Sequence, residues 1–136
     1  MPGLGFRLFG WGRLPAELRT AMEIEGMRVC IEGARAWVTL RDFRGKRRYA
    51  SRRKRTATAG VAVSERRLAV VLGRRLLINV PLTDPRLEHF ELSTSGERFT
   101  LAFDAGTVSD VATGRVEVAV RTPQAAEILH WIEAGR

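Results

Sequence analysis

The segment GRVEVAVRTPQAAEILHWIE, residues 114–133, decides the fold because its apolar period changes in the middle. Its first half carries valines at alternate positions, the pattern of a half-buried strand. Thr122 is a good helix N-cap and Pro123 suits a first helical position. The apolar side chains that follow have the i, i+3, i+4, i+7 spacing of one helix face. They are Ala125, Ile128, Leu129 and Ile132. The segment predicts a strand and then a helix that packs on a sheet.

Upstream of this segment, period-two alternation recurs in short runs separated by turn residues. The predicted strands are 27–31, 36–43, 57–63, 68–72, 75–80, 87–92 and 99–103, before the last one at 116–120. Gly33-Ala34 is interpreted as a turn, and Pro15 can open a short helix that ends at Gly26. Counted from Ala36, seven strands and a terminal helix predict a mostly β domain. Its sheet is expected to be bent, or a partly open barrel, with the helix as its cap.

Length and composition indicate one folded domain. The chain has 136 residues, of which 45% are hydrophobic and 28% charged, a globular balance. We expect residues 1–13 to form a flexible lead-in and 14–136 a single domain. The only cysteine, Cys30, cannot form an intrachain disulfide. No apolar run approaches the ~18 residues of a membrane span, and the start lacks a secretory apolar region. These features predict a cytoplasmic protein, with peripheral contact at a membrane as an option.

Two stretches in the middle of the chain resemble pleckstrin-homology-like (PH-like, GRAM-like) modules. Residues 61–68, VAVSERRL, are similar to the Thr/Ser-x-x-Arg-Leu hairpin of those modules, and 78–82, INVPL, to a strand that ends in Ile/Val-Pro-Leu. With the strand and helix up to Ile132, the resemblance covers somewhat more than half of the chain. It implies a seven-stranded bent sheet capped by a helix, in a non-catalytic binding module. Members of the family bind phosphoinositides, other anionic surfaces or protein segments, and fold alone does not choose among them.

The net charge of +8 is concentrated in the first part of the chain. Residues 1–82 hold 18 Arg/Lys and 6 Asp/Glu, whereas 83–136 hold 5 and 9. Nine of the fifteen residues from Arg41 to Arg55 are basic, in what we interpret as a loop between strands. Such a segment predicts contact with an anionic partner. The candidate residues are Arg44, Lys46, Arg47, Arg48, Arg52, Arg53, Lys54 and Arg55.

Several interpretations of this basic segment compete. It could contact anionic lipid or an acidic protein, since Arg binds phosphates and carboxylates with a two-pronged fork. It could bind nucleic acid, or it could only keep a loop solvated. It lacks the Lys-x-Lys/Arg headgroup motif of phosphoinositide-binding PH domains. A different hypothesis is self-association through a sheet edge near 57–63, which would make the protein a homo-oligomer.

The sequence offers no catalytic, cofactor or metal site. His89, His130 and Cys30 are isolated, and zinc sites need clustered ligands. The serines lack the glycines of a nucleophile elbow. The Gly-x-Gly stretches near the N-terminus lack a preceding strand and a full nucleotide-loop motif. We therefore predict a binding module that is not an enzyme.

Overall fold

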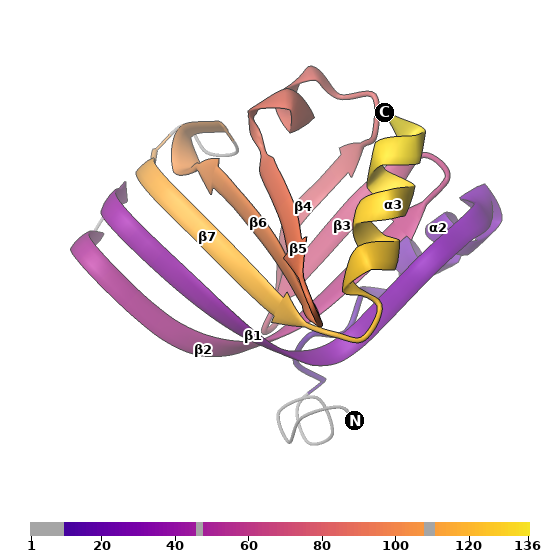
Figure 1. Ribbon diagram of the computed structural model, residues 1–136, viewed down its shortest axis with the longest axis horizontal. Helices are drawn as coiled ribbons and strands as arrows, with labels where there is room; N and C mark the ends of the chain where they lie inside the picture. Colours follow the sequence, from indigo (N-terminus) through magenta and orange to yellow (C-terminus); the bar gives the residue numbers. More distant parts are fainter. Residues whose placement is uncertain (1–9, 46–47, 108–110) are drawn as a thin grey trace.

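The protein is mostly β, with seven antiparallel strands in one open sheet and a C-terminal helix (Figure 1). A computed structural model describes residues 10–45, 48–107 and 111–136, with only the backbone for 48–51. The helices are α2 (Ala16–Gly26) and α3 (Ala125–Gly135), with 3-10 turns at Pro85–His89 and Ala105–Thr107. The strands are β1 (Met27–Gly45), β2 (Arg48–Ser64), β3 (Arg67–Leu72), β4 (Arg75–Pro81), β5 (Glu91–Ser95), β6 (Arg98–Asp104) and β7 (Thr113–Arg121). The predicted fold class is confirmed.

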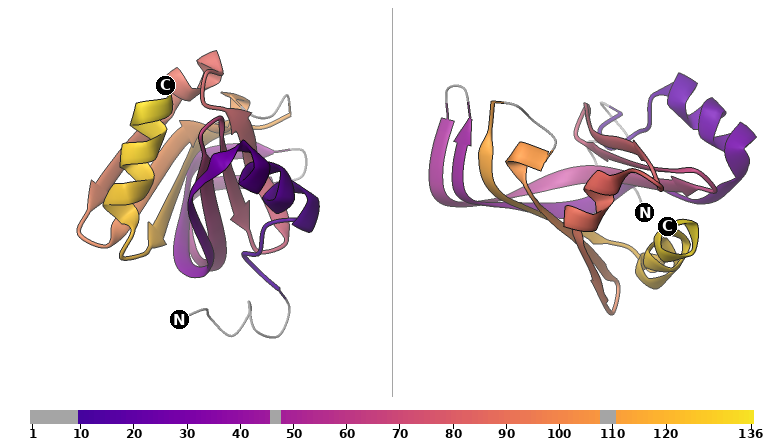
Figure 2. Two further views of the ribbon diagram at one scale, coloured as in Figure 1. Left: turned by 90° about the vertical axis from the view of Figure 1, so that its right-hand side faces the viewer. Right: turned by 90° about the horizontal axis from the view of Figure 1, so that it is seen from above.

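The strand order is β4-β3-β2-β1-β7-β6-β5, with the two longest strands at the centre. Within β2, only residues 59–63 pair with β3. Within β1, only residues 36–44 pair with β7. The long strands therefore belong to two half-sheets. One contains β4, β3 and the adjoining ends of β2 and β1, and the other contains the opposite ends of β2 and β1 with β7, β6 and β5. Figure 2 shows the strong twist of β1 and β2 between the halves.

The main core lies between the inner face of the bent sheet and α3. The fully buried side chains Phe99, Val118, Ile128 and Ile132 belong to it. Three of the four predicted α3 positions are buried and Leu129 is partly exposed, so the predicted cap is confirmed. The helix begins at Ala125 with Gln124 as its N-cap, so the predicted N-cap Thr122 and first helical residue Pro123 were wrong by two residues. The backbone N–H of Gln124 donates to Thr122 Oγ1 at 3.1 Å in the turn before the helix.

A second, smaller core lies on the opposite face, under α2. It contains Leu14, Met22, Ala62, Ala69 and Val71. The sequence predicted a helix after Pro15, but it did not predict which face of the sheet this helix packs against. α2 and α3 thus lie on opposite sides of the sheet, as Figure 2 shows.

Residues 10–13 of the expected lead-in lie against the sheet. The N–H of Gly12 donates to the carbonyl oxygen of Gly73 at 2.7 Å, and its carbonyl accepts from Gly33 N–H at 3.3 Å. Gly60 of β2 lies directly beneath, where a Cβ would be only 2.3 Å from Gly12 O. Two glycines therefore allow the chain to cross the sheet before α2. Residues 1–9 lie outside the described residues.

Three further local predictions were wrong. Gly33-Ala34 is not a turn: β1 continues through it with a register shift, and Gly33 takes the positive φ of 72° that favours glycine. The predicted strand at 87–92 is a 3-10 turn followed by β5, because Asp84 caps the turn by accepting the Arg86 N–H at 2.9 Å. The basic segment is not a loop in its described part, since 48–55 are the first residues of β2.

The edge proposed for self-association is also not available as predicted. Residues 59–63 of β2 pair with β1 on one side and β3 on the other. The edge of β2 that is not paired lies further toward its start. None of the described helices combines the length and apolar character needed to cross a bilayer.

Candidate functional site

The predicted basic residues lie at one end of the β1–β2 hairpin. Arg44 is on β1, and Arg52, Arg53, Lys54 and Arg55 are on β2, all with exposed side chains. Lys46 and Arg47 lie outside the described residues, and only the backbone of Arg48 is described. Pairing with β1 keeps this charged stretch extended, because β1 hydrogen-bonds with the backbone of every second residue while successive side chains alternate between faces.

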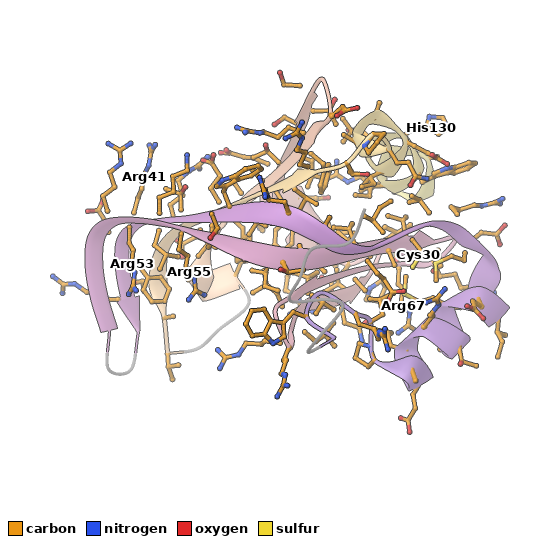
Figure 3. All side chains as sticks on the ribbon, turned by 90° about the horizontal axis from the view of Figure 1, so that it is seen from below. Cys30, Arg41, Arg53, Arg55, Arg67 and His130 are labelled. Carbon is orange, nitrogen blue, oxygen red and sulfur yellow. The ribbon has the colours of Figure 1, made fainter. Side chains whose placement is uncertain are left out.

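The structure divides these residues between two faces of the sheet. Arg53 pairs with Leu40 and Arg55 with Val38, so both arginines share the inner face with the apolar core. Arg52 pairs with Arg41, so it lies on the outer face, and Lys54 follows the same alternation. Figure 3 shows Arg53 and Arg55 on the opposite side of the ribbon from Arg41. The predicted residues at 52–55, whose side chains are described, therefore form a two-sided strip and not one pocket.

On the outer face, arginines lie side by side across three strands. Arg41 of β1 is opposite Arg52 of β2 on one side and Arg115 of β7 on the other. Like charges directly opposite each other are destabilising. Arg115 is compensated by Glu91, whose Oε2 lies 2.7 Å from its Nη2. Among the described residues, no acid pairs with Arg41 or Arg52, so this part of the row remains open to an external anion.

Other strands contribute outer-face arginines that were not predicted from the sequence. Arg98 of β6 lies over the Trp37 ring, with its Cζ 4.9 Å from the ring centroid, and it pairs with Arg121 of β7. The alternation of Arg115, Glu117, Ala119 and Arg121 could have indicated their common face. The strand order that places them beside β1 and β2 could not be read from it.

Arginines near α2, in contrast, form salt bridges with acidic side chains of the protein. Arg19 Nη1 lies 2.5 Å from Glu32 Oε1, and Arg67 Nε lies 2.6 Å from Glu25 Oε1. Arg28 pairs with Glu65. In the described part of the chain, Arg41 and residues 52–55 form no such salt bridge. At Arg41 and residues 52–55 the hairpin end therefore carries exposed positive charge that no acid among the described residues neutralises.

Other chemistry has little support in the described residues. They contain no group of three or more His, Cys, Asp or Glu side chains that could hold a metal ion. Cys30 is half-buried, and desolvation, followed by the charge of Glu32, raises the pKa of its thiol, which makes it a poorer nucleophile at neutral pH. A hollow beside the irregular part of β1 has mixed lining charges, including Glu32, Glu97 and Arg121. It favours no single class of ligand.

Comparisons with known proteins do not assign the chain to a family. No model of a known protein family matches it, and no curated protein matches it either.

The Glu91–Arg115 pair gives a test of the outer-face charges. The hydrogen bond from Arg115 lowers the pKa of the Glu91 carboxyl. Because the folded pKa is the lower one, this pair stabilises the folded protein above the ordinary glutamate range, and the contribution is lost as pH falls through the folded pKa. We expect NMR titration to give a depressed Glu91 pKa, and Arg115→Gln to raise it to the ordinary range. An unchanged pKa in the variant would contradict the pairing.

Proposed function

We propose that this chain is a PH-like binding module without catalytic activity. Support comes from the sheet order, in which β1 lies between β2 and β7 and the remaining strands extend outward on both sides. It also comes from α3, which packs its buried face on the inner side of the bent sheet. The sequence resemblance implies a seven-stranded bent sheet capped by a helix, and the number of strands and the helical cap agree with it. We propose that the exposed surface of this scaffold contacts the partner.

The proposed activity is to bind an anionic partner at the basic end of the β1–β2 hairpin. We call Arg41, Arg52, Arg53, Lys54 and Arg55 the basic strip. The observation that carries the proposal is that all five side chains are exposed and none forms a salt bridge within the described residues. Elsewhere, the protein pairs several arginines with its own acids. Free cations packed on neighbouring strands gain most from a ligand that supplies the missing negative charge.

The charge of the strip limits how tightly it can bind by electrostatics alone. Each cation near an anionic surface contributes about 1 kcal/mol, so five give about 5 kcal/mol. That corresponds to a dissociation constant on the order of 0.1–1 mM. A specific partner therefore needs contacts in addition to charge.

Binding assays on three anionic probes test this proposal. The probes are vesicles with anionic lipid, an acidic peptide and a single-stranded RNA, each at low and moderate salt. We compare the wild type with the variant Arg41→Gln, Arg52→Gln, Lys54→Gln. The control is Arg74→Gln, Arg75→Gln, which removes two exposed charges at the β3–β4 turn. We expect at least one probe to bind, with affinity reduced about a hundredfold by the strip variant, which removes about 3 kcal/mol of attraction, and little by the control. Equal losses in both variants, or no binding of any probe, would overturn the proposal.

The nucleic-acid alternative has a weaker structural basis. Single-stranded nucleic acids bind sheets through exposed aromatic rings on which bases stack. Trp37, on the outer face of β1, is only partly exposed and already carries the Arg98 guanidinium. RNA binding stronger than peptide or vesicle binding, with a steep salt dependence, would reverse this order of preference.

A further inference from the structure

We infer that the unpaired edge of β2 from Arg52 to Ala57 accepts an acidic polypeptide segment as an added β-strand. This rests on the proposed function, because it names the partner of the same basic strip. Among the described residues, this stretch pairs with β1 on one side and with no strand on the other. Its backbone N–H and C=O groups can therefore bind an extended chain from outside.

The hydrogen bonds at the end of β3 show which groups face outward. Thr58 O accepts from Gly73 N–H at 2.8 Å, on the side of β2 away from β1. In a strand, the backbone groups of alternate residues point to the same side. The register with β1 runs without a shift from Ala59 to Arg52, so Thr56, Lys54 and Arg52 continue the alternation that starts at Thr58. Their N–H and C=O groups are directed to the open edge.

The side chains next to this edge select the charge of the incoming strand. Arg53 and Arg55 lie on the inner face, and Arg52 and Lys54 on the outer face. An added strand projects its own side chains alternately to the two faces. Acidic residues at consecutive positions would therefore meet cations on both sides, which a neutral or basic segment would not. The backbone hydrogen bonds supply the contacts that charge alone does not.

The same geometry disfavours two other occupants. A second copy of the chain, paired through the same edge, would place its own row of Arg and Lys against this one, and opposed like charges are destabilising. A flat bilayer can reach the cations of only one face, because the sheet itself separates Arg53 and Arg55 from Arg52 and Lys54. An extended acidic chain is the partner that uses both faces and the edge between them.

The test measures binding of the fluorescent, end-blocked peptide Thr-Glu-Glu-Val-Glu-Glu-Thr to the full chain at low salt. Two further peptides carry N-methyl groups on one or the other alternate set of backbone amides, with the charge unchanged. In an added strand only one set faces β2, so we expect one methylated peptide to lose binding at least tenfold while the other binds as well as the parent. Loss of binding for neither peptide, or an equal loss for both, would overturn strand addition.

Protein variants provide an independent arm. Thr56→Pro removes an outward N–H and leaves the pairing with β1 intact, since proline is tolerated on an edge. We expect it to weaken peptide binding about tenfold, and Thr56→Ser to have little effect. Arg53→Gln, Arg55→Gln is expected to weaken binding several-fold, in contrast to Arg74→Gln, Arg75→Gln. The methylated peptides give an answer even if Thr56→Pro fails to fold.

The outcomes separate this inference from the proposed function. Vesicles that bind through the basic strip, with no binding of the acidic peptide, would overturn strand addition but leave an anion-binding module. RNA that binds through the basic strip, with no binding of the acidic peptide, would lead to the same conclusion. Absence of binding to all three probes would overturn both proposals, and the edge arginines would then act only to keep β2 from pairing with other chains.

Discussion

Ile128→Asp is expected to abolish the cooperative unfolding transition of this protein. Ile128 lies in α3 with 0% of its surface exposed and belongs to the main core. Truncation of such a side chain costs about 2–5 kcal/mol, and an unpaired buried carboxylate adds several more. A domain of this size has a total stability of about 5–15 kcal/mol. Urea unfolding followed by circular dichroism should therefore show no folded baseline.

Two variants of the same helix serve as controls for this result. Ile128→Val keeps an apolar side chain and is expected to lower the free energy of unfolding by about 0.5–1.5 kcal/mol. Ala126→Asp adds the same charge at an exposed position in the first turn of α3, where an acid is favourable. It should unfold like the wild type. A normal transition for Ile128→Asp would mean that α3 does not seal the sheet.

Gly60→Ala is expected to destabilise the protein by about 1–3 kcal/mol, as overpacking does in a tight site. The new Cβ would be 2.3 Å from Gly12 O, which is a backbone atom and cannot rotate away. Residues 10–13 would have to move off the sheet, with loss of the bond from Gly33 N–H to Gly12 O. Chemical denaturation gives the change in free energy, and faster amide exchange at Gly12 and Gly33 would show where it arises.

Gly135→Ala is a matched control, because its Cβ would be equally close to another atom. That atom is Leu82 Cδ1, at 2.2 Å, the end of a flexible side chain. A rotamer change can relieve the contact, and Ala favours the helix over Gly by about 1 kcal/mol. We expect a change in unfolding free energy within about 1 kcal/mol. Equal destabilisation by both glycine variants would contradict the backbone explanation for Gly60.

Much of the fold was predictable from periodicity. The valines at 116, 118 and 120 and the apolar spacing from Ala125 to Ile132 follow from which residues must leave water in a strand and in a helix. Buried positions on these elements agree with that pattern. Errors occurred where the period signal is absent. The charged residues 52–55 have no apolar alternation, so nothing local indicated that β2 continues through them as a strand.

The candidate site, like the fold, was predicted only in part from the sequence. The sequence identified the cationic segment from its composition, and it named four side chains, at 52–55, that the structure describes as exposed on β2. It could not assign them to faces, because that depends on the register with β1. Nor could it find Arg98 and Arg121, which come from strands far along the chain.

The strand-rich pattern, the terminal amphipathic helix and the excess of arginine before residue 56 follow from residue type and local spacing, so they can be read from the amino-acid sequence. The three-dimensional fold ends the pairing of β3 at Ala59, which leaves an open edge beside the basic strip. It also determines which arginines form salt bridges with carboxylates and which do not. Edges and ion pairs depend on contacts between segments distant in the chain, and no local pattern encodes them.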